Sequence, residues 1–480
     1  MKRLRLGAAL SLFALVPACG GGGSSGGGAV IDTPAPTPTP TPTQTACSLR
    51  DRQQWAATQL REWYLFPETL PATLDPAPYA TVDDYIDALT ATARAQGRDR
   101  YFTYLTSIAD EDAYYETGAS AGFGFRLGTD ANGRVFVVET FENTPALAAG
   151  IDRGAEITAI GTSAATLQTV SALYASGGSA AVNAAFGPLT AGTTRVLTIV
   201  DSTGTRTVTL TKAEFDLTPV SSRYGAKIIT DGGRRVGYLN LRTFISTADP
   251  ALRSAFADFR AQGLTEFIID LRYNGGGLVS IAELMGDLLG GNRLASDVFS
   301  YTTFRPEKSA ENETRQFARQ SQSVSPVKIA FIGSGGTASA SELVINSFIP
   351  YFHANLALVG ANTYGKPVGQ VALDRPECDD RLRVVAFAKQ NRDRQGDYYD
   401  GLAGKVDASC QARDDIAFPL GDAREDSVAR ALDFLAGRTC TPIGGATAAA
   451  RSLRAAATGP DTLLAPDRPN TAQREAPGIY

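Results

Sequence analysis

The chain has 480 residues, and its 45 basic side chains nearly balance its 50 acidic ones. This length suggests about three domains of roughly 150 residues each, and an apolar content of 43% is ordinary for a globular protein with a sizeable core. No cluster of Lys and Arg occurs beyond Lys2, Arg3 and Arg5, so the composition gives no support to nucleic-acid binding. The single histidine, His353, excludes multi-histidine metal sites, and we expect neither a metal nor a cofactor.

The N-terminus has the pattern of an export signal. Its positive residues precede an apolar run, Leu6 to Val16, that is too short to span a membrane. The stretch Leu15-Val-Pro-Ala-Cys19 resembles a bacterial lipobox, which implies removal of residues 1–18 and lipidation of Cys19. Signal cleavage without a lipid is the alternative. Because Gly20 rather than Asp follows the cysteine, the resemblance to lipoprotein sorting signals favours the outer membrane and the periplasmic face of a bacterial cell envelope.

Residues 19–46 are a Gly/Ser tract followed by Thr-Pro repeats, which is typical of a tether. Four cysteines remain beyond it, and an even number in an exported protein suggests disulfides. Three pairings are possible. We favour Cys378–Cys410, because both residues flank one polar excursion, and this leaves Cys47–Cys440 to join the two ends of the folded part.

Residues 47–117 have the pattern of a helical domain. Gln54 to Trp63 carries apolar residues at helical spacing, and Thr81 to Ala95 is expected to form a second helix with Thr81 as its N-cap. No catalytic constellation occurs in this region, so we interpret it as a packing or lid module.

Residues 118–215 change to a β-rich pattern, with strands expected at 135–139, 196–200 and 206–210. The segment from Thr144 to Ile157 and the preceding Gly-Phe-Gly-Phe stretch together resemble a PDZ domain. That resemblance implies that the backbone N–H groups of Gly122, Phe123, Gly124 and Phe125 receive a peptide's terminal carboxylate. Glycines let such N–H groups converge on an anion, and a neighbouring strand edge can add the peptide as an extra strand. A β-domain that binds nothing is the alternative.

Residues 216–440 alternate between strand and helix patterns. Strands are expected at 236–244, 266–272, 327–332, 356–360, 370–373 and 381–389, with helices at 250–261, up to Leu289, and from about Thr337. This alternation predicts a largely parallel sheet with its site at the carboxyl ends of the strands. The remaining residues, 441–480, are Ala- and Pro-rich and are expected to be a disordered tail.

Two glycine clusters, 275–277 and 335–336, follow strands of this predicted sheet, and each lets the backbone approach a substrate closely. The second cluster leads into a helix start that carries the hydroxyls of Thr337, Ser339 and Ser341. We expect the nucleophile among these three residues.

The stretch Gly360-Ala-Asn-Thr-Tyr-Gly-Lys-Pro367 matches most of a phosphate-binding loop, but we reject that interpretation. Pro367 replaces the hydroxyl that would hold Mg²⁺, and a strand pattern rather than a helix follows. Lys366 is then a lysine that Tyr364 and Pro367 can shield from water. Desolvation lowers a lysine pKa toward the range useful to a general base, so Lys366 could take a proton from Ser339. An ordinary surface lysine is the alternative.

Three stretches, in this order, resemble the motifs of the C-terminal processing peptidases, also called tail-specific proteases, over about residues 48–440. They are Asp270-Leu-Arg-Tyr-Asn-Gly-Gly-Gly277, Thr337-Ala-Ser-Ala-Ser-Glu-Leu343 and Tyr364-Gly-Lys-Pro-Val-Gly-Gln370. The resemblance implies that Ser339 is the nucleophile, Lys366 the base and Gln370 the residue that orients the base. It also implies an oxyanion hole from the N–H groups of Gly276 and Ala340.

The sequence departs from the family at Pro367, where Gly is usual, and this puts the geometry of the base in question. Ser341 is the rival nucleophile. Glu342 could bond to Lys366 or to helix-end amides, and His353 is interpreted as structural or exposed. The expected fold class is α+β and multidomain: an N-terminal helical segment, a PDZ-like domain and an α/β, ClpP/crotonase-like catalytic core.

The sequence therefore predicts an envelope-anchored serine endopeptidase that binds apolar C-terminal tails of proteins or peptides and cleaves them by a Ser-Lys(-Gln) mechanism. A catalytically inactive, PDZ-containing peptide-binding scaffold on the same fold is the alternative. A hydratase-like protein is a third possibility, because the expected core resembles the crotonase layout, but no acyl-carrier signature supports it.

Overall fold

The computed structural model describes residues 47–444, 460 and 462–480. The predicted signal peptide, the lipidation of Cys19 and the tether lie outside these residues. Within the described ranges, none of the helices combines the length and the apolar character that a membrane crossing requires.

The central sheet has six strands in the order β10-β11-β12-β15-β16-β19. Their bounds are β10 (Ala226–Asp231), β11 (Arg234–Asn240), β12 (Glu266–Asp270), β15 (Lys328–Gly333), β16 (Leu356–Gly360) and β19 (Ala408–Gln411). β10 runs antiparallel to β11, and all other neighbours are parallel. The carboxyl ends of β12, β15 and β16 therefore share one edge of the sheet.

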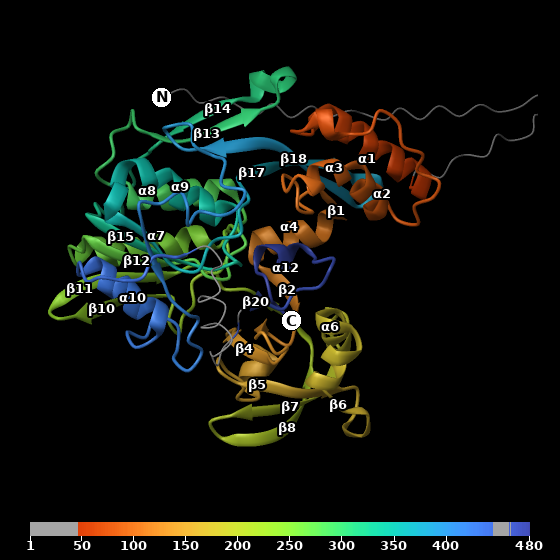
Figure 1. The fold of residues 1–480 in the computed structure, drawn as a ribbon, viewed down its shortest axis with the longest axis horizontal. Coiled ribbons are helices and arrows are strands. Elements are labelled where there is room, and N and C mark those ends of the chain that lie inside the picture. Colours follow the sequence, from red (N-terminus) through yellow and green to blue (C-terminus); the bar gives the residue numbers. More distant parts are fainter. Residues whose placement is uncertain (1–46, 445–459, 461) are drawn as a thin grey trace, which may run out of the picture. The chain divides into compact units, whose positions relative to one another are not determined.

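Helices cover both faces of this sheet. Figure 1 shows α7 (Ala248–Ala261), α8 (Val279–Leu289) and α9 (Ala340–Phe352) on one face and α10 (Asp426–Leu435) on the other. Because successive side chains of a strand point to opposite faces, Phe267 and Ile269 pack into the core beneath α7, α8 and α9, whereas Ile268 packs with α10. Burial on both faces explains why these strands are continuous apolar runs.

A second, antiparallel sheet has the order β1-β18-β13-β14, with β17 also paired to β18. Its strands are β1 (Tyr104–Ser107), β13 (Val298–Phe304), β14 (Glu313–Gln316), β17 (Val368–Arg375) and β18 (Asp380–Gln390). The sequence pattern placed the last two in the parallel sheet, and this was wrong. Only the short turn η5 (Pro376–Cys378) joins β17 to β18, and a connection of that length permits only antiparallel pairing.

The N-terminal helices pack on this second sheet. They are α1 (Leu49–Trp63), α2 (Val82–Leu89) and α3 (Ala91–Ala95), and α4 (Ile108–Thr117) follows β1. Thr81 is the N-cap of α2 as predicted, since its Oγ1 accepts a hydrogen bond from the Asp84 N–H at 3.0 Å.

A third sheet has seven strands in the order β20-β3-β4-β5-β7-β8, with β6 beside β5. The strands are β3 (Phe125–Thr129), β4 (Val135–Thr140), β5 (Glu156–Gly161), β6 (Gln168–Thr169), β7 (Thr194–Asp201), β8 (Gly204–Thr211) and β20 (Thr462–Leu463). The helices α5 (Pro145–Ala148) and α6 (Val170–Phe186) accompany this sheet, and β2 (Ala119–Gly122) pairs with β9 (Ala213–Asp216). The strands expected at 135–139, 196–200 and 206–210 are confirmed.

The end of the chain corrects the expectation of a disordered tail. Residues 462–480 contain β20 and the helix α12 (Thr471–Glu475), which begins after the N-cap Asn470. Ala476, Ile479 and Tyr480 are buried in the protein. The low local hydrophobicity of this segment concealed the few apolar residues that anchor it.

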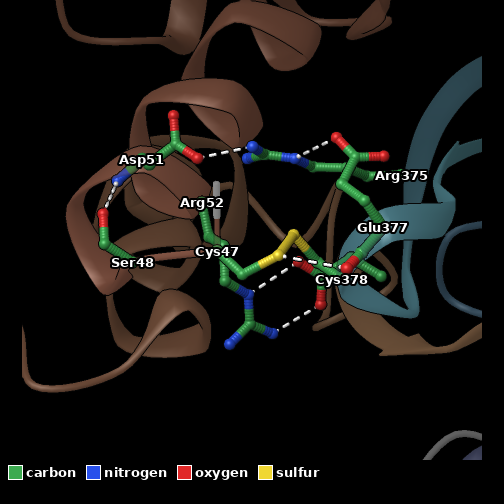
Figure 2. Close-up of a disulfide and its surroundings, with 8 residues drawn as sticks. Cys47, Ser48, Asp51, Arg52, Arg375, Glu377 and Cys378 are labelled. Atoms are coloured by element: carbon green, nitrogen blue, oxygen red, sulfur yellow. Dashed lines mark hydrogen bonds and ion pairs between the residues drawn. A yellow bond between two sulfur atoms is a disulfide. The ribbon is translucent and has the colours of Figure 1, made fainter. Parts of the chain in front are cut away.

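The disulfides also differ from the favoured pairing. Cys47 is joined to Cys378, and Cys410 is joined to Cys440, with Cα–Cα distances of 5.6 and 5.4 Å. Neither Cys378–Cys410 nor Cys47–Cys440 forms. Cys47 precedes α1, which packs on β18, so it meets the β17–β18 turn that carries Cys378 (Figure 2).

Ion pairs reinforce the contact around Cys47–Cys378. Figure 2 shows Arg375 between Asp51 of α1 and Glu377 of the turn. At the other disulfide, Cys410 lies on the edge strand β19 and Cys440 follows α10, which packs on that strand. Tertiary packing rather than distance along the chain therefore selects both pairs.

Candidate active site

Ser339 lies where the central sheet meets α9. β15 ends at Gly333, a glycine-rich turn follows, and Ser339 is the N-cap residue immediately before Ala340. Its backbone has a φ of 53°, a conformation that non-glycine residues rarely adopt and that is often found at functional sites. The residue is half-buried, so its hydroxyl is not sealed within the core.

The hydroxyls of Ser341 and Thr337, the two alternatives to Ser339, are buried and hydrogen-bonded. Ser341 is fully buried, and its Oγ donates to the Asn274 carbonyl at 3.0 Å. Thr337 is also fully buried and donates to the Leu271 carbonyl at 2.9 Å. A hydroxyl that is buried and already hydrogen-bonded to the main chain is poorly placed to attack a substrate, so the surroundings favour Ser339.

The predicted oxyanion donors lie beside Ser339. A Cβ on Gly276 would lie 2.8 Å from the Ser339 Cβ and 3.2 Å from the Ala340 nitrogen, so the two chain segments touch there. Ala340 is the first residue of α9, where helix N–H groups lack an intrahelical partner. The Gly276 N–H instead donates to Asn274 Oδ1 at 3.0 Å. Its use as an oxyanion donor therefore requires this bond to be exchanged for one to substrate.

The residues before Gly276 form a rigid support for it. Arg272 pairs with Asp270 at 3.0 Å and with Glu425 at 2.9 Å, and all three side chains are buried. Glu425 also caps α10, since its Oε2 accepts from the Val428 N–H at 3.0 Å. These ion pairs hold the end of β12 in place, and with it the glycines that follow.

Glu342 connects Ser339, the predicted nucleophile, to Lys366, the predicted base. Its fully buried carboxylate accepts the N–H groups of Ser339 at 3.1 Å, Gly365 at 2.7 Å and Lys366 at 2.7 Å. Burial raises the Glu342 pKa to about 6, although these amides oppose the shift. Of the two roles considered from the sequence, Glu342 therefore bonds to amides, including that of Lys366, and not to the lysine side chain.

Lys366 has the surroundings expected of a general base. Its side chain is half-buried, with Nζ 5.0 Å from the centroid of the Phe102 ring. Desolvation lowers the Lys366 pKa from its ordinary value, and the Glu475 carboxylate opposes this effect. Nζ donates to Gln370 Oε1 at 2.8 Å, and Gln370 Nε2 donates in turn to the Phe102 carbonyl.

Pro367 fits the local structure. It directly precedes β17, and its carbonyl accepts the Lys389 N–H of β18 at 2.9 Å. A strand start is a position where proline is tolerated, since no ladder hydrogen bond needs its missing N–H. The Lys366 amide keeps its bond to Glu342 despite this neighbour.

The loop that is predicted to bind a peptide carboxylate is hydrogen-bonded to another part of the chain. The Gly124 N–H donates to the main-chain oxygen of Tyr480 at 2.9 Å, and the Phe125 N–H lies 3.4 Å from the same oxygen. Gly122 touches Tyr480 as well, and the rings of Phe123 and Phe125 are buried beneath the loop. Nothing in the sequence pattern pointed to this occupant.

A cavity of about 920 Å³ extends from Lys366 along the carboxyl ends of the strands of the central sheet. Its lining includes Lys366, Tyr364 and Phe102, and also Arg474 and Glu475 from α12. Sequence reasoning missed Phe102, Asn274 and Glu475. Asn274 stands inside a motif and could have been noted, whereas the other two come from regions without any catalytic pattern.

His353 is exposed, as one of the two interpretations from the sequence had it, and its Nδ1 lies 3.7 Å from Asp407 Oδ2. Among the described residues, no group of three or more His, Cys, Asp or Glu side chains could hold a metal ion.

The fold combines helices with several sheets, and one part of it matches a known family. Residues 235–396 match the family model described as "Peptidase family S41". The predicted resemblance to C-terminal processing peptidases and the mixed α+β fold class are thereby confirmed.

Two curated relatives have similar sequences. The chloroplastic C-terminal processing peptidase of Tetradesmus obliquus is 27% identical over 185 residues, which are 35% of this chain and 36% of the relative. The carboxyl-terminal-processing protease of Picosynechococcus sp. is 26% identical over 176 residues, 36% of this chain and 38% of the relative. The match therefore spans a little over a third of each relative.

A solved structure shares the fold over a longer range. A protein described as a putative S41 protease from Bacteroides fragilis superposes with a TM-score of 0.62 at 23% identity, covering 80% of this chain and 97% of that one.

Proposed function

We propose that this chain is a serine endopeptidase that binds the C-terminal ends of proteins and hydrolyses a peptide bond of the bound chain. Ser339 Oγ attacks the carbonyl carbon while neutral Lys366 accepts its proton. Lys366 then protonates the leaving amine, and water hydrolyses the acyl-enzyme. The N–H groups of Ala340 and Gly276 stabilise the oxyanion, and the loss of one such donor typically costs about 10² to 10³ in rate.

The observation that carries this proposal is the link through Glu342. One buried carboxylate binds the amides of both Ser339 and Lys366, so the nucleophile and a lysine with a depressed pKa are fixed to the same anchor. Lys366 Nζ donates to Gln370 rather than to Ser339 Oγ. Proton transfer requires Lys366 Nζ to come within hydrogen-bonding reach of Ser339 Oγ.

Residues 118–215 are proposed to act as a PDZ-like module that receives apolar C-terminal tails at Gly122, Phe123, Gly124 and Phe125. The edge of β3 and the loop amides before it support this role, because both already make main-chain hydrogen bonds to an extended segment, residues 478–480. Export, lipidation of Cys19 and an outer-membrane location complete the proposal and rest on the sequence pattern.

The test compares three purified proteins on a substrate with an apolar C-terminal tail: the parent, Ser339→Ala and Ser341→Ala. We expect Ser339→Ala to lose hydrolysis and labelling by a fluorophosphonate probe, and Ser341→Ala to retain most of both, because its hydroxyl is buried and bonded to Asn274. Undiminished cleavage by Ser339→Ala would refute the assignment. A parent that neither cleaves nor reacts would favour the inactive scaffold.

A further inference from the structure

The last residues of the chain lie against the predicted peptide groove. Ile479 bridges Arg126 of β3 in antiparallel orientation, and the Tyr480 N–H donates to the Phe125 carbonyl at 3.0 Å. The Leu127 N–H donates to the Gly478 carbonyl at 2.8 Å. Residues 478–480 thus add a short strand to the edge of β3, which is how an extended peptide binds a sheet.

The Tyr480 side chain fills a built pocket. It is 3% exposed, and its ring centroid lies 5.1 Å from that of Phe186 on α6. Its hydroxyl donates to Asn183 Oδ1. A Cβ on Gly122 would lie 2.6 Å from the Tyr480 backbone, so only glycine leaves room for this residue. The pocket therefore suits an aromatic residue that carries a hydroxyl.

The same segment reaches the catalytic side of the molecule. The Gly275 N–H, one residue before the predicted oxyanion donor, donates to the Glu475 carbonyl at 2.9 Å. The Arg474 guanidinium stacks on Tyr104 at 3.7 Å and donates to the Tyr101 carbonyl at 2.9 Å. Arg474 and Glu475 line the cavity that contains Lys366. A substrate tail cannot occupy this space while α12 is in place.

The conformation of the segment is that of an inhibitor rather than a substrate. A peptide bond must be presented in an extended form for a serine to attack it, whereas residues 471–475 are helical where they pass the site. The Glu475 carbonyl is bound by Gly275 and not by the predicted oxyanion donors, so it is not held for attack.

We propose that residues 470–480 are a built-in occupant of the peptide groove and of the cavity beside Lys366, and that they inhibit the enzyme until a substrate tail displaces them. The displacing tail places a tyrosine or a similar aromatic residue in the Tyr480 pocket and pairs with β3 in an extended conformation, because that is what the pocket and the β3 edge accommodate. This inference rests on the proposed peptidase function.

The experiment releases the segment without altering the groove. Gly478 has a φ of 84°, and a Cβ there would lie 2.8 Å from the Leu127 carbonyl oxygen, so Gly478→Ala unseats only the occupant. Gly263→Ala is the matched control, because Gly263 has a φ of 65° with nothing near its Cβ position. Tyr480→Ala is a second variant that removes the anchoring ring.

Binding is measured by fluorescence anisotropy with a labelled peptide of residues 474–480, and hydrolysis is measured on the tailed substrate. We expect Gly478→Ala and Tyr480→Ala to bind the labelled peptide at least about tenfold more tightly than the parent, since a competing occupant lowers the apparent affinity by the fraction of open groove. Hydrolysis should rise in parallel, and Gly263→Ala should match the parent in both.

Equal binding by the parent and both release variants would overturn the inference. If hydrolysis requires Ser339 but is the same in the parent, Gly478→Ala and Tyr480→Ala, the peptidase function is supported and inhibition by residues 470–480 is refuted. If Gly478→Ala and Tyr480→Ala bind the peptide more tightly but no protein hydrolyses the substrate, occupation of the groove by residues 478–480 is supported and the peptidase function is refuted.

Discussion

Replacing Glu342 by glutamine tests the anchor that joins Ser339 to Lys366. The carboxylate accepts three amide N–H groups, two at Oε2 and one at Oε1. Glutamine keeps one oxygen, so its NH₂ group must face at least one of these donors, most simply that of Gly365. An unsatisfied buried donor costs about 1–3 kcal/mol.

The neutral side chain recovers part of this loss. Because burial raises the Glu342 pKa from 4.5 to about 6, ionisation in the folded protein costs about 2 kcal/mol that glutamine avoids. The two effects nearly cancel, so the stability of the variant should lie within about 1 kcal/mol of that of the parent. A shift of about 1 Å in the Lys366 backbone is expected to lower kcat about 10²-fold, with little change in KM.

The assay measures kcat, KM and urea denaturation for the parent, Glu342→Gln and Asp287→Asn. Asp287 is a buried carboxylate that accepts the Ala318 N–H at 2.7 Å and pairs with Arg315, on a different part of the fold. Asp287→Asn should lose stability but keep kcat. If both variants lose activity to the same extent, or if Glu342→Gln keeps full activity, the positioning role is refuted.

The same carboxylate predicts how stability depends on pH. Its folded-state pKa lies above the ordinary value of 4.5, so the native state binds more protons than the unfolded chain between about pH 4.5 and 6. The Glu342 contribution to the free energy of unfolding is therefore present below pH 4.5, and about 2 kcal/mol of it is lost as pH rises through 6. Glu342→Gln should lack this decline.

Two further predictions concern the disulfides and the base. Non-reducing digestion should yield a peptide with Cys47 joined to Cys378, and recovery of a Cys378–Cys410 peptide would contradict the structure. A Cys410→Ser/Cys440→Ser variant should lose about 3–4 kcal/mol of its free energy of unfolding, by the loop-entropy relation for a separation of 30 residues. Gln370→Ala removes an acceptor that stabilises the Lys366 ammonium, so the acid limb of the pH profile of kcat/KM should move to lower pH while kcat falls. An unmoved limb would argue against Lys366 as the titrating base.

The sequence by itself determined the local parts of the site. The apolar run at 327–332, the glycines after it and the helix that follows are set by neighbouring residues, and the structure has β15, the turn and α9 at these places. The sequence also ranked Ser339 above Ser341 by resemblance, and the burial of the Ser341 hydroxyl supplies a physical reason for that order.

Only the tertiary structure decided which distant segments meet. Cys47 pairs with Cys378 across 331 positions because α1 packs on β18, and Phe102 reaches Lys366 from a region with no catalytic pattern. The placement of Tyr480 in the groove beside β3 likewise depends on an open strand edge and a pocket that form only after folding. Such contacts follow from the shapes and unpaired hydrogen-bonding groups that the rest of the fold leaves available, and no local pattern of residues encodes them.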